Sequence, residues 1–384
     1  MPFAADVFTT LGNATTYNHQ RLAQHDLAQV DAMMIRSTTK VDAALIGQLS
    51  RCQYLATATA GYNHLDLDTL GTSAIQTYIA AGCNAESVAE YALSGVLYAL
   101  LQRQQIHLGQ TIDALESFTV GVVGLGQVGR RVQAKFVALG MQVHGYDPLR
   151  ADAEAQPQWH DLDQVLACDI ICLHAPLVKT GPYPSAHLFN AEVLARLQPH
   201  QILLNAGRGE VIDNQALLRQ CEAQLAPCLI LDVWEHEPDI LQPLIAHCLL
   251  ATPHIAGHSM EGKTRGTFML YDWLCQQTDQ PMTQQMHDFL PDAIQHVVCA
   301  DEQLTIASLS TLVWSIYDIA IDHSEFVANM AQSPCFAKLR KTYRDPAIHP
   351  TTTPRREFDT LNITCTFAHT QTVLSALGFT ATTL

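Results

Sequence analysis

The sequence predicts an α/β protein with two doubly wound parallel-sheet domains and a small C-terminal α+β domain. The chain has 384 residues, of which 48% are hydrophobic and 15% charged, so it is long enough for two or three compact globular domains. Short apolar strands alternate with helical stretches through about the first 285 residues, which is typical of parallel sheets covered by helices. A glycine-rich loop begins only at Gly124, and the roughly 100 residues before it therefore form a separate domain.

Three strands and one long helix are expected before the glycine-rich loop. Residues 86–101 form the helix, which is largely buried and leads toward the loop. The strands lie in the apolar stretches DAMMIRS (31–37), YLATATAG (54–61) and AIQTYIA (74–80).

Six further strands follow at regular intervals and indicate a second parallel sheet. They are TVGVVG (119–124), MQVHGYD (141–147), DIICLHAP (169–176), QILLNAG (201–207), CLILDVW (228–234) and LLATPHI (249–255).

The character of the sequence changes after about Pro281. A strand and then a helix are expected over 297–320, another strand over 360–368 and a short helix over 370–379, which together suggest a small α+β domain. The segment 340–358 is rich in Pro, Thr and Arg, and we expect a loop there.

Charge and cysteine content exclude several classes of function. A formal net charge of -16 disfavours a nucleic-acid or anionic-membrane partner, because phosphate backbones require clustered Lys and Arg. The 11 cysteines are an odd number without a repeated C-x-x-C spacing, so we expect reduced thiols and no metal site. The N-terminus lacks a basic stretch followed by an apolar one, and we expect a cytoplasmic location.

The glycine-rich loop has the context of a dinucleotide site. Gly124, Gly126 and Gly129 follow an apolar strand and precede a helical pattern. The first glycine permits a tight turn, the second lets a pyrophosphate approach the backbone, and the third lets the helix pack on the strand. Asp147 ends the next strand, where a carboxylate accepts hydrogen bonds from ribose hydroxyls and repels a 2′-phosphate. This arrangement predicts a Rossmann domain that binds NAD in preference to NADP; the alternative is a glycine-rich turn beside a surface aspartate.

Three polar residues just past apolar strands are the candidate catalytic groups. Hydride transfer at a carbinol needs a base for the hydroxyl proton and a cation for a substrate carboxylate. His254 could take the proton, Glu237 could orient the imidazole, and Arg208 could hold the carboxylate. Taken singly, each could instead be an ordinary loop residue. Asp232 could face the nicotinamide amide or merely cap a turn.

Four ordered motifs then resemble the D-isomer-specific 2-hydroxyacid dehydrogenases, over about residues 30–270. They are GLGQVGRR (124–131), LLNAGRGEVID (203–213), LDVWEHEP (231–238) and TPHIAGHSMEGKTRG (252–266). The resemblance implies a flavodoxin-like substrate domain split between 1–95 and 255–284, and a Rossmann NAD domain at 96–254. It assigns catalysis to Arg208, Glu237 and His254.

The resemblance also implies the remaining site residues. NAD would be held by Gly124, Gly126, Gln127, Val128, Gly129, Asp147, Ala175, Ala206, Gly207, Arg208, Asp232 and Gly257. Ser37, Thr59 and His258 would contact the substrate. The chain departs from the family at two positions, because His258 stands where Tyr is typical and Ala175 where a Thr often contacts NAD.

Further stretches are similar to one branch of this family, whose members take a phosphorylated 2-hydroxy acid. They are MMIRSTTKV (33–41), ATATAGYNHLD (56–66), AAGCNAESVAEY (80–91), FAKLRKTY (336–343) and RREF (355–358). In that branch the C-terminal domain, here 285–384, forms a homodimer. A simpler 2-hydroxyacid dehydrogenase, such as a phosphoglycerate dehydrogenase, and a non-catalytic NAD-sensing regulator are the alternatives.

A phosphate dianion in an acidic protein needs local cations. Arg36 and Lys40 flank Ser37 and are candidates. A second group of cations near the C-terminus could reach a phosphate, either in the same chain or in the other chain of a dimer. The alternative is that these cations form a solvated basic face. This group, which we call the C-terminal basic cluster, comprises Arg340, Lys341, Arg344, Arg355 and Arg356.

Overall fold

A computed structural model of the chain describes residues 1–153, 159–333, 335–345, 348 and 352–384. It divides into two compact units. Unit 1 comprises Met1–Ala85 and Ser259–Asp292, and unit 2 comprises Glu86–His258 and Ala293–Leu384.

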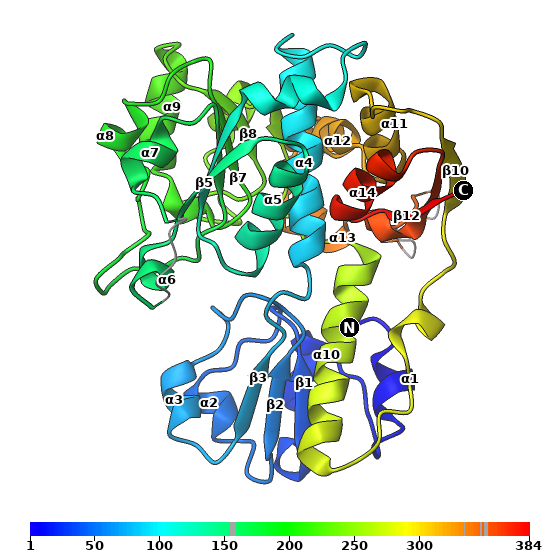
Figure 1. Ribbon diagram of the computed structural model, residues 1–384. Coiled ribbons are helices and arrows are strands. Elements are labelled where there is room, and N and C mark those ends of the chain that lie inside the picture. Colours follow the sequence, from blue (N-terminus) through cyan, green and yellow to red (C-terminus); the bar gives the residue numbers. More distant parts are fainter. Residues whose placement is uncertain (154–158, 334, 346–347, 349–351) are drawn as a thin grey trace. The chain divides into compact units, whose positions relative to one another are not determined.

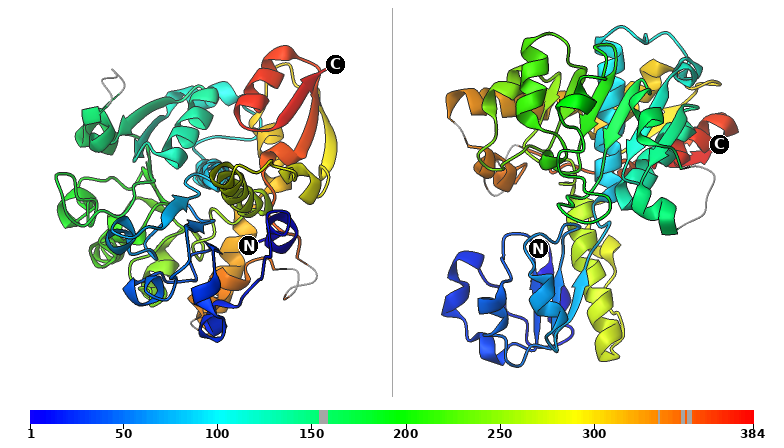
Figure 2. Two further views of the ribbon diagram at one scale, coloured as in Figure 1. Left: turned by 90° about the horizontal axis from the view of Figure 1, so that it is seen from below. Right: turned by 90° about the vertical axis from the view of Figure 1, so that its left-hand side faces the viewer.

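Unit 1 is built on a three-stranded parallel sheet in the order β1-β2-β3. The helix α10 lies along one side of this sheet, and the short helices α2 and α3 lie on the other (Figures 1 and 2). Gly266 lets α10 approach closely, because a Cβ there would lie 3.0 Å from the carbonyl oxygen of Ala58. The elements are α1 (Ala4–Phe8), η1 (His19–Gln24), η2 (Leu27–Gln29), β1 (Ala32–Ile35), α2 (Ala43–Ile46), β2 (Tyr54–Thr57), α3 (Leu67–Gly71), β3 (Gln76–Ile79), α10 (Met260–Thr278) and η6 (Met286–Phe289).

The larger sheet of unit 2 has six parallel strands in the order β5-β4-β6-β7-β8-β9. The strand order reverses at β4, and a crevice at the carboxyl ends of β4 and β6 is where open α/β sheets bind ligands. The helices and strands from the first part of the unit are α4 (Ala85–Gln102), η3 (Ile112–Ser117), β4 (Thr119–Val123), α5 (Gln127–Ala138), β5 (Gln142–Tyr146), α6 (Pro148–Ala153), α7 (Leu162–Leu166), β6 (Ile170–Leu173), α8 (Ala191–Leu194), β7 (Ile202–Asn205), η4 (Gly209–Val211), α9 (Asn214–Glu222), β8 (Cys228–Leu231), η5 (Gln242–His247) and β9 (Leu250–Ala251).

The C-terminal part of unit 2 carries a second, three-stranded parallel sheet in the order β10-β11-β12. Helices connect these strands, so the predicted C-terminal combination of helices and strands has the parallel arrangement that such crossovers require. The elements are β10 (Gln295–Cys299), α11 (Ile306–Ile316), α12 (Ile319–Gln332), α13 (Phe336–Thr342), η7 (Phe358–Thr360), β11 (Leu361–Cys365), α14 (Ala368–Ala376) and β12 (Thr380–Thr383).

One hydrophobic core joins the C-terminal elements to the dinucleotide sheet. Leu309 of α11 and Leu374 of α14 belong to the same buried cluster as Val96 of α4 and Phe136 of α5. Lys135 of α5 is also buried, donates a hydrogen bond to the carbonyl of Leu377, and lies 2.5 Å from Glu86. The residues from Ala293 onward therefore share a core with the rest of unit 2. The predicted domain boundary near residue 285 stays a prediction.

The expected α/β class and the parallel sheets are confirmed, and each of the nine predicted strands of the first 285 residues contains a strand. Two expectations about the C-terminal segment need correction. Residues 340–342 end the helix α13 rather than belonging to a loop, while 346–347 and 349–351 lie outside the described residues. The strand β12 was not expected, because its short run TATT is polar and mostly exposed and shows no alternation. All 11 cysteines are free in the structure.

Candidate active site

The glycine-rich loop joins β4 to α5 at the reversal of strand order. Gly124 has a φ of +86°, and a Cβ there would lie 2.7 Å from the Ala175 backbone. At Gly129 a Cβ would lie 2.0 Å from the carbonyl oxygen of Gly124, whereas at Gly126 it would meet nothing within 4 Å. The first and third glycines are thus required by the turn and by helix packing, and the second leaves open space in front of the helix. This open, side-chain-free approach fits a pyrophosphate.

Asp147 lies at the end of β5 and is tied to the same loop. Its Oδ2 accepts a hydrogen bond from the Leu125 amide at 2.9 Å, and its Oδ1 accepts one from the Arg150 amide at 3.2 Å. The carboxylate therefore fixes the glycine-rich loop and caps the start of α6. Its position at the end of the second strand also fits the acidic residue that contacts a ribose in NAD sites.

Buried Asp232 organises the turn that carries His254. Its Oδ1 accepts hydrogen bonds from the Thr252 hydroxyl and the Ile255 amide, both at 2.7 Å, and its Oδ2 accepts one from the Ala256 amide at 2.9 Å. Burial raises the pKa of Asp232, while the charge of His254 and these hydrogen bonds work in the opposite direction. Of the two predicted roles, the contacts correspond to the turn cap; the role toward nicotinamide stays a prediction.

The turn holds His254 in a left-handed backbone conformation, with a φ of +59°. Such a conformation costs a non-glycine residue roughly 1–3 kcal/mol and persists where its surroundings fix it. Here the His254 amide donates to the Asp232 carbonyl at 2.7 Å, in addition to the contacts of the Asp232 carboxylate. The strain and the dense hydrogen bonding mark the position as one whose geometry is functionally constrained.

Glu237 and His254 form a close imidazole–carboxylate contact at this site. His254 Nδ1 lies 2.7 Å from Glu237 Oε2, and Glu237 Oε1 accepts a hydrogen bond from the Trp234 amide at 3.0 Å. Burial works to raise the pKa of Glu237, but the hydrogen bond and charge of His254, with a contribution from Arg340, hold it below its usual value. The carboxylate is thus ionised near neutral pH and fixes the orientation of the ring.

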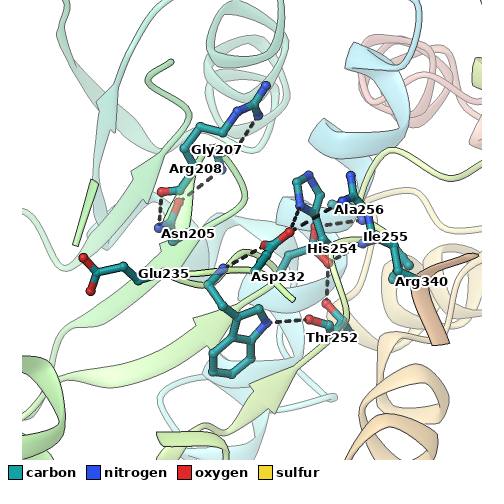
Figure 3. A network of polar contacts seen from close by, with 12 residues as sticks. Asn205, Gly207, Arg208, Asp232, Glu235, Thr252, His254, Ile255, Ala256 and Arg340 are labelled. Atoms are coloured by element: carbon teal, nitrogen blue, oxygen red, sulfur yellow. Dashed lines mark hydrogen bonds and ion pairs between the residues drawn. The ribbon is translucent and has the colours of Figure 1, made fainter. Parts of the chain in front are cut away.

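Arg208 lies on the loop after β7, next to the same site. Its Nη1 donates to the Gly207 carbonyl at 2.7 Å, and Asn205 Nδ2 donates to the Arg208 carbonyl at 3.0 Å. Gly209 is required there, because a Cβ would lie 1.9 Å from the Trp234 backbone. Figure 3 shows Arg208, Asp232 and His254 in one close view of this network. The structure brings the three predicted catalytic residues and Asp232 to one edge of the β7–β8–β9 part of the sheet.

The other predicted cofactor residues lie at the same edge of the sheet. Gln127 and Val128 are the first residues of α5, and Ala175 follows β6. Ala206 and Gly207 follow β7, and a Cβ on Gly207 would lie 3.0 Å from the Ala175 carbonyl oxygen. Gly257 directly follows Ala256 in the turn fixed by Asp232, and the neighbouring His258 ring lies 6.0 Å from the Tyr343 ring.

A second imidazole–carboxylate pair was not predicted from the sequence. His187 Nε2 lies 2.6 Å from Glu235 Oε1, and Glu235 Oε2 accepts a hydrogen bond from the Asn214 amide at the start of α9. The His187 side chain is 47% exposed, against 25% for His254. Glu235 stands two residues before Glu237 in the same motif and could have been noticed there. Nothing in the sequence indicated that His187 would contact it.

Ser37 and Thr59 each lie two residues past the end of a strand in unit 1. The strand ends Ile35 and Thr57 are aligned in the parallel register, so both side chains belong to the same edge of that sheet. The Thr59 hydroxyl donates to the Gly61 carbonyl at 3.0 Å. Arg36 is half-buried, and Lys40 is exposed and lies 3.9 Å from Asp42.

The members of the C-terminal basic cluster have separate surroundings. Arg355 is 1% exposed and donates to the carbonyls of Ala256 and Ser87 at 2.7 and 2.6 Å. Arg344 pairs with buried Asp322 at 3.0 Å. Arg340 lies 3.6 Å from Glu237 Oε2, and Lys341 is exposed. The expectation of one solvated face was therefore wrong, whereas contact between a member of the cluster and a phosphate stays a prediction.

No helix in the described part of the chain is long and apolar enough to cross a membrane. Among the same residues, no group of His, Cys, Asp and Glu side chains could hold a metal ion.

Two family models match the chain. Residues 97–256 match the family described as D-isomer specific 2-hydroxyacid dehydrogenase, NAD binding domain. Residues 289–378 match a domain of unknown function, DUF3410. The first match covers the glycine-rich loop, Asp147, Asp232 and the Glu237–His254 pair.

Solved structures share the fold of a large part of this chain. D-Lactate dehydrogenase from Aquifex aeolicus, complexed with NAD and lactic acid, is 21% identical with a TM-score of 0.56, over 72% of this chain and 92% of that one. NAD-bound 3-phosphoglycerate dehydrogenase from Entamoeba histolytica is 20% identical with a TM-score of 0.58, over 73% and 92%.

Relatives that match almost the full length are more similar. Erythronate-4-phosphate dehydrogenase from Pseudoalteromonas atlantica is 40% identical over 99% of this chain and 97% of its own. The enzyme of the same name from Edwardsiella ictaluri is 39% identical over 99% and 97%. The chain therefore belongs to the erythronate-4-phosphate dehydrogenase family, a branch of the NAD-dependent D-isomer-specific 2-hydroxyacid dehydrogenases.

Proposed function

We propose that this enzyme oxidises 4-phospho-D-erythronate at C2 to 3-hydroxy-2-oxo-4-phosphooxybutanoate, a step of pyridoxal 5′-phosphate biosynthesis. The observation that carries the chemistry is the Glu237–His254 contact of 2.7 Å beside the turn fixed by Asp232. The substrate comes from the names of relatives that match this chain over nearly their whole length.

His254 is the proposed base. Because Nδ1 points at an ionised carboxylate, the proton of the neutral ring resides on Nδ1, and Nε2 carries the lone pair. Nε2 accepts the proton of the C2 hydroxyl as the C2–O bond gains double-bond character. Glu237 then stabilises the imidazolium that forms, so the positive charge develops next to a fixed negative one. NAD, when bound, accepts the hydride from C2.

Arg208 is the proposed cation for the C1 carboxylate. A guanidinium can hold a carboxylate by two parallel hydrogen bonds and so orient C2 relative to the base. Its loop is fixed by Asn205 and by the close approach of Gly209 to Trp234, which limits the positions that the side chain can take. Ser37, Thr59, His258, Arg36 and Lys40 are proposed to contact the rest of the substrate, the last two its phosphate.

The cofactor is proposed to lie along the carboxyl edge of the six-stranded sheet. Gly124, Gly126, Gln127, Val128 and Gly129 would hold the pyrophosphate. Asp147 would hold the adenosine ribose, since its carboxylate is fixed by the glycine-rich loop. The nicotinamide end would be held by Ala175, Ala206, Gly207, Arg208, Asp232 and Gly257. A homodimer through residues 285–384 is a further proposal, supported by the resemblance alone. A cytoplasmic location is also proposed, supported by the free cysteines.

Turnover on a panel of hydroxy acids tests the proposed function. The purified protein is mixed with NAD and 4-phosphoerythronate, 3-phosphoglycerate or D-lactate, and NADH formation is followed with coupled removal of the keto acid. We expect the highest kcat/KM with 4-phosphoerythronate. A preference for 3-phosphoglycerate or D-lactate would contradict the substrate, and NADH binding without turnover on any acid would favour an NAD-sensing regulator.

A further inference from the structure

A carboxylate next to an imidazole creates a problem for a base. Glu237 stabilises the imidazolium, but the oxidation needs a neutral imidazole at the start of each turnover. An uncompensated carboxylate therefore favours the protonated, inactive form of His254. A cation beside the carboxylate reduces this effect, because it competes for the same negative charge.

Arg340 supplies such a cation from helix α13, in the C-terminal part of unit 2. Its Nη1 lies 3.6 Å from Glu237 Oε2, the oxygen that also contacts His254 Nδ1. This separation is an ion pair rather than a hydrogen bond. The Arg340 side chain is 37% exposed and Glu237 is 17% exposed, so the pair lies partly shielded from water.

The position of Arg340 is fixed from both ends of its helix. Phe336, at the start of α13, is buried and packs edge-on against Phe326, with ring centroids 6.1 Å apart. Phe326 in turn lies 5.9 Å from the ring of Trp234, whose amide holds Glu237. At the other end, the hydroxyl of Tyr343 donates to buried Asp322 at 2.7 Å. The helix that carries Arg340 is therefore packed against the segment that carries Glu237.

We propose that Arg340 is a positioning residue, which holds Glu237 in place and keeps His254 available as a neutral base. This inference rests on the proposed role of His254. The charged groups that act on the pair include the Asp232 carboxylate, which interacts with His254, and the Arg340 guanidinium, which interacts with Glu237. The C-terminal segment thus contributes to the chemistry of the same chain, which is a role separate from dimerisation.

The test compares pH profiles of kcat/KM for wild type, Arg340→Gln and Arg340→Lys, with the acid that gives the highest turnover. Loss of the charge in Arg340→Gln should move the acidic limb to higher pH by about 0.5 pH unit or more, which is about threefold in activity on the acid side. Arg340→Lys should restore most of the wild-type profile. Lys341→Gln is the matched control, since it removes the same charge from an exposed position of the same helix.

An NMR titration of the His254 ring, assigned with His254→Asn, gives a second readout that does not need activity. We expect its midpoint to move to higher pH in Arg340→Gln. An unchanged limb and midpoint in Arg340→Gln, or an equal shift in Lys341→Gln, would overturn the proposal. If His254→Asn itself kept wild-type turnover, the failure would lie in the proposed function and not in Arg340 alone.

Discussion

Replacement of Arg355 tests whether the C-terminal segment is part of the structure around the catalytic turn. Arg355 donates from Nη1 to the Ala256 carbonyl at 2.7 Å and from Nη2 to the Ser87 carbonyl at 2.6 Å. Its guanidinium also lies 3.6 Å from the centroid of the Tyr317 ring. Arg355→Met keeps an unbranched apolar stem and removes the charge and both hydrogen bonds.

The expected loss is about 3–5 kcal/mol in the free energy of unfolding, the range for breaking a buried charge interaction from one side. Hydrogen bonds from a charged group contribute about 1.5–3 kcal/mol each, and a desolvated cation–π contact about 2 kcal/mol. The desolvation cost of burying the guanidinium is absent from the variant, and this offsets part of that sum. Burial and the charge of Glu357 raise the pKa of Glu90 and Arg355 counteracts them, so the loss of Arg355 should raise this pKa further.

Urea denaturation followed by circular dichroism measures this loss, with Arg196→Met as the matched control in the same unit. Arg196 pairs with Asp163 at 2.7 Å, but the two side chains are 50% and 75% exposed. Such an exposed pair should contribute less than about 1 kcal/mol. Equal, small losses in the two variants would refute the claim that Arg355 is a structural cation of the core.

Three further predictions concern the loop and Glu237. Gly129→Ala should abolish NADH binding and lower the melting temperature, because its Cβ would lie 2.0 Å from the Gly124 carbonyl oxygen. Gly126→Ala should leave the melting temperature unchanged, since no atom lies within 4 Å of the added Cβ. It should still weaken NADH binding by at least about tenfold, because the methyl group fills the space in front of the helix. Fluorescence titration and thermal melts distinguish the two variants. The folded-state pKa of Glu237 lies below the usual 4.5, so its charge stabilises the folded protein above about pH 4.5, and this contribution is lost as the pH falls through the lower folded value. The difference in unfolding free energy between wild type and Glu237→Gln should therefore shrink below pH 4.5, and a difference that stays constant down to pH 3 would contradict the assignment.

The sheet and the glycine-rich loop could be predicted because their signals are local. Apolar runs mark the buried strands, and the three glycines of the loop keep a fixed spacing between a strand and a helix. The placement of Arg208, Glu237 and His254 after three successive strands was also enough to bring them together, since parallel strands end at one edge of a sheet.

The roles of the C-terminal cations could not be predicted, because they depend on partners far away in the sequence. Arg355 bonds to Ser87, 268 residues earlier, and Arg340 reaches a carboxylate that is itself the partner of His254. Composition groups these arginines with Lys341 as one basic stretch, whereas burial separates them. Asp232 shows a related limit, since its place after a strand is visible in the sequence but its three hydrogen bonds to one turn are not.

The central claim is that His254 is the base, and a comparison of two histidines tests it most directly. His254 and His187 both contact a glutamate, at 2.7 and 2.6 Å, and both have a positive φ, +59° and +49°. Asn tolerates this backbone conformation, so His254→Asn and His187→Asn are matched changes. We expect His254→Asn to lower kcat by at least about 100-fold while NADH still binds, and His187→Asn to stay within a few-fold of wild type. A kcat of His254→Asn close to that of His187→Asn would contradict the account.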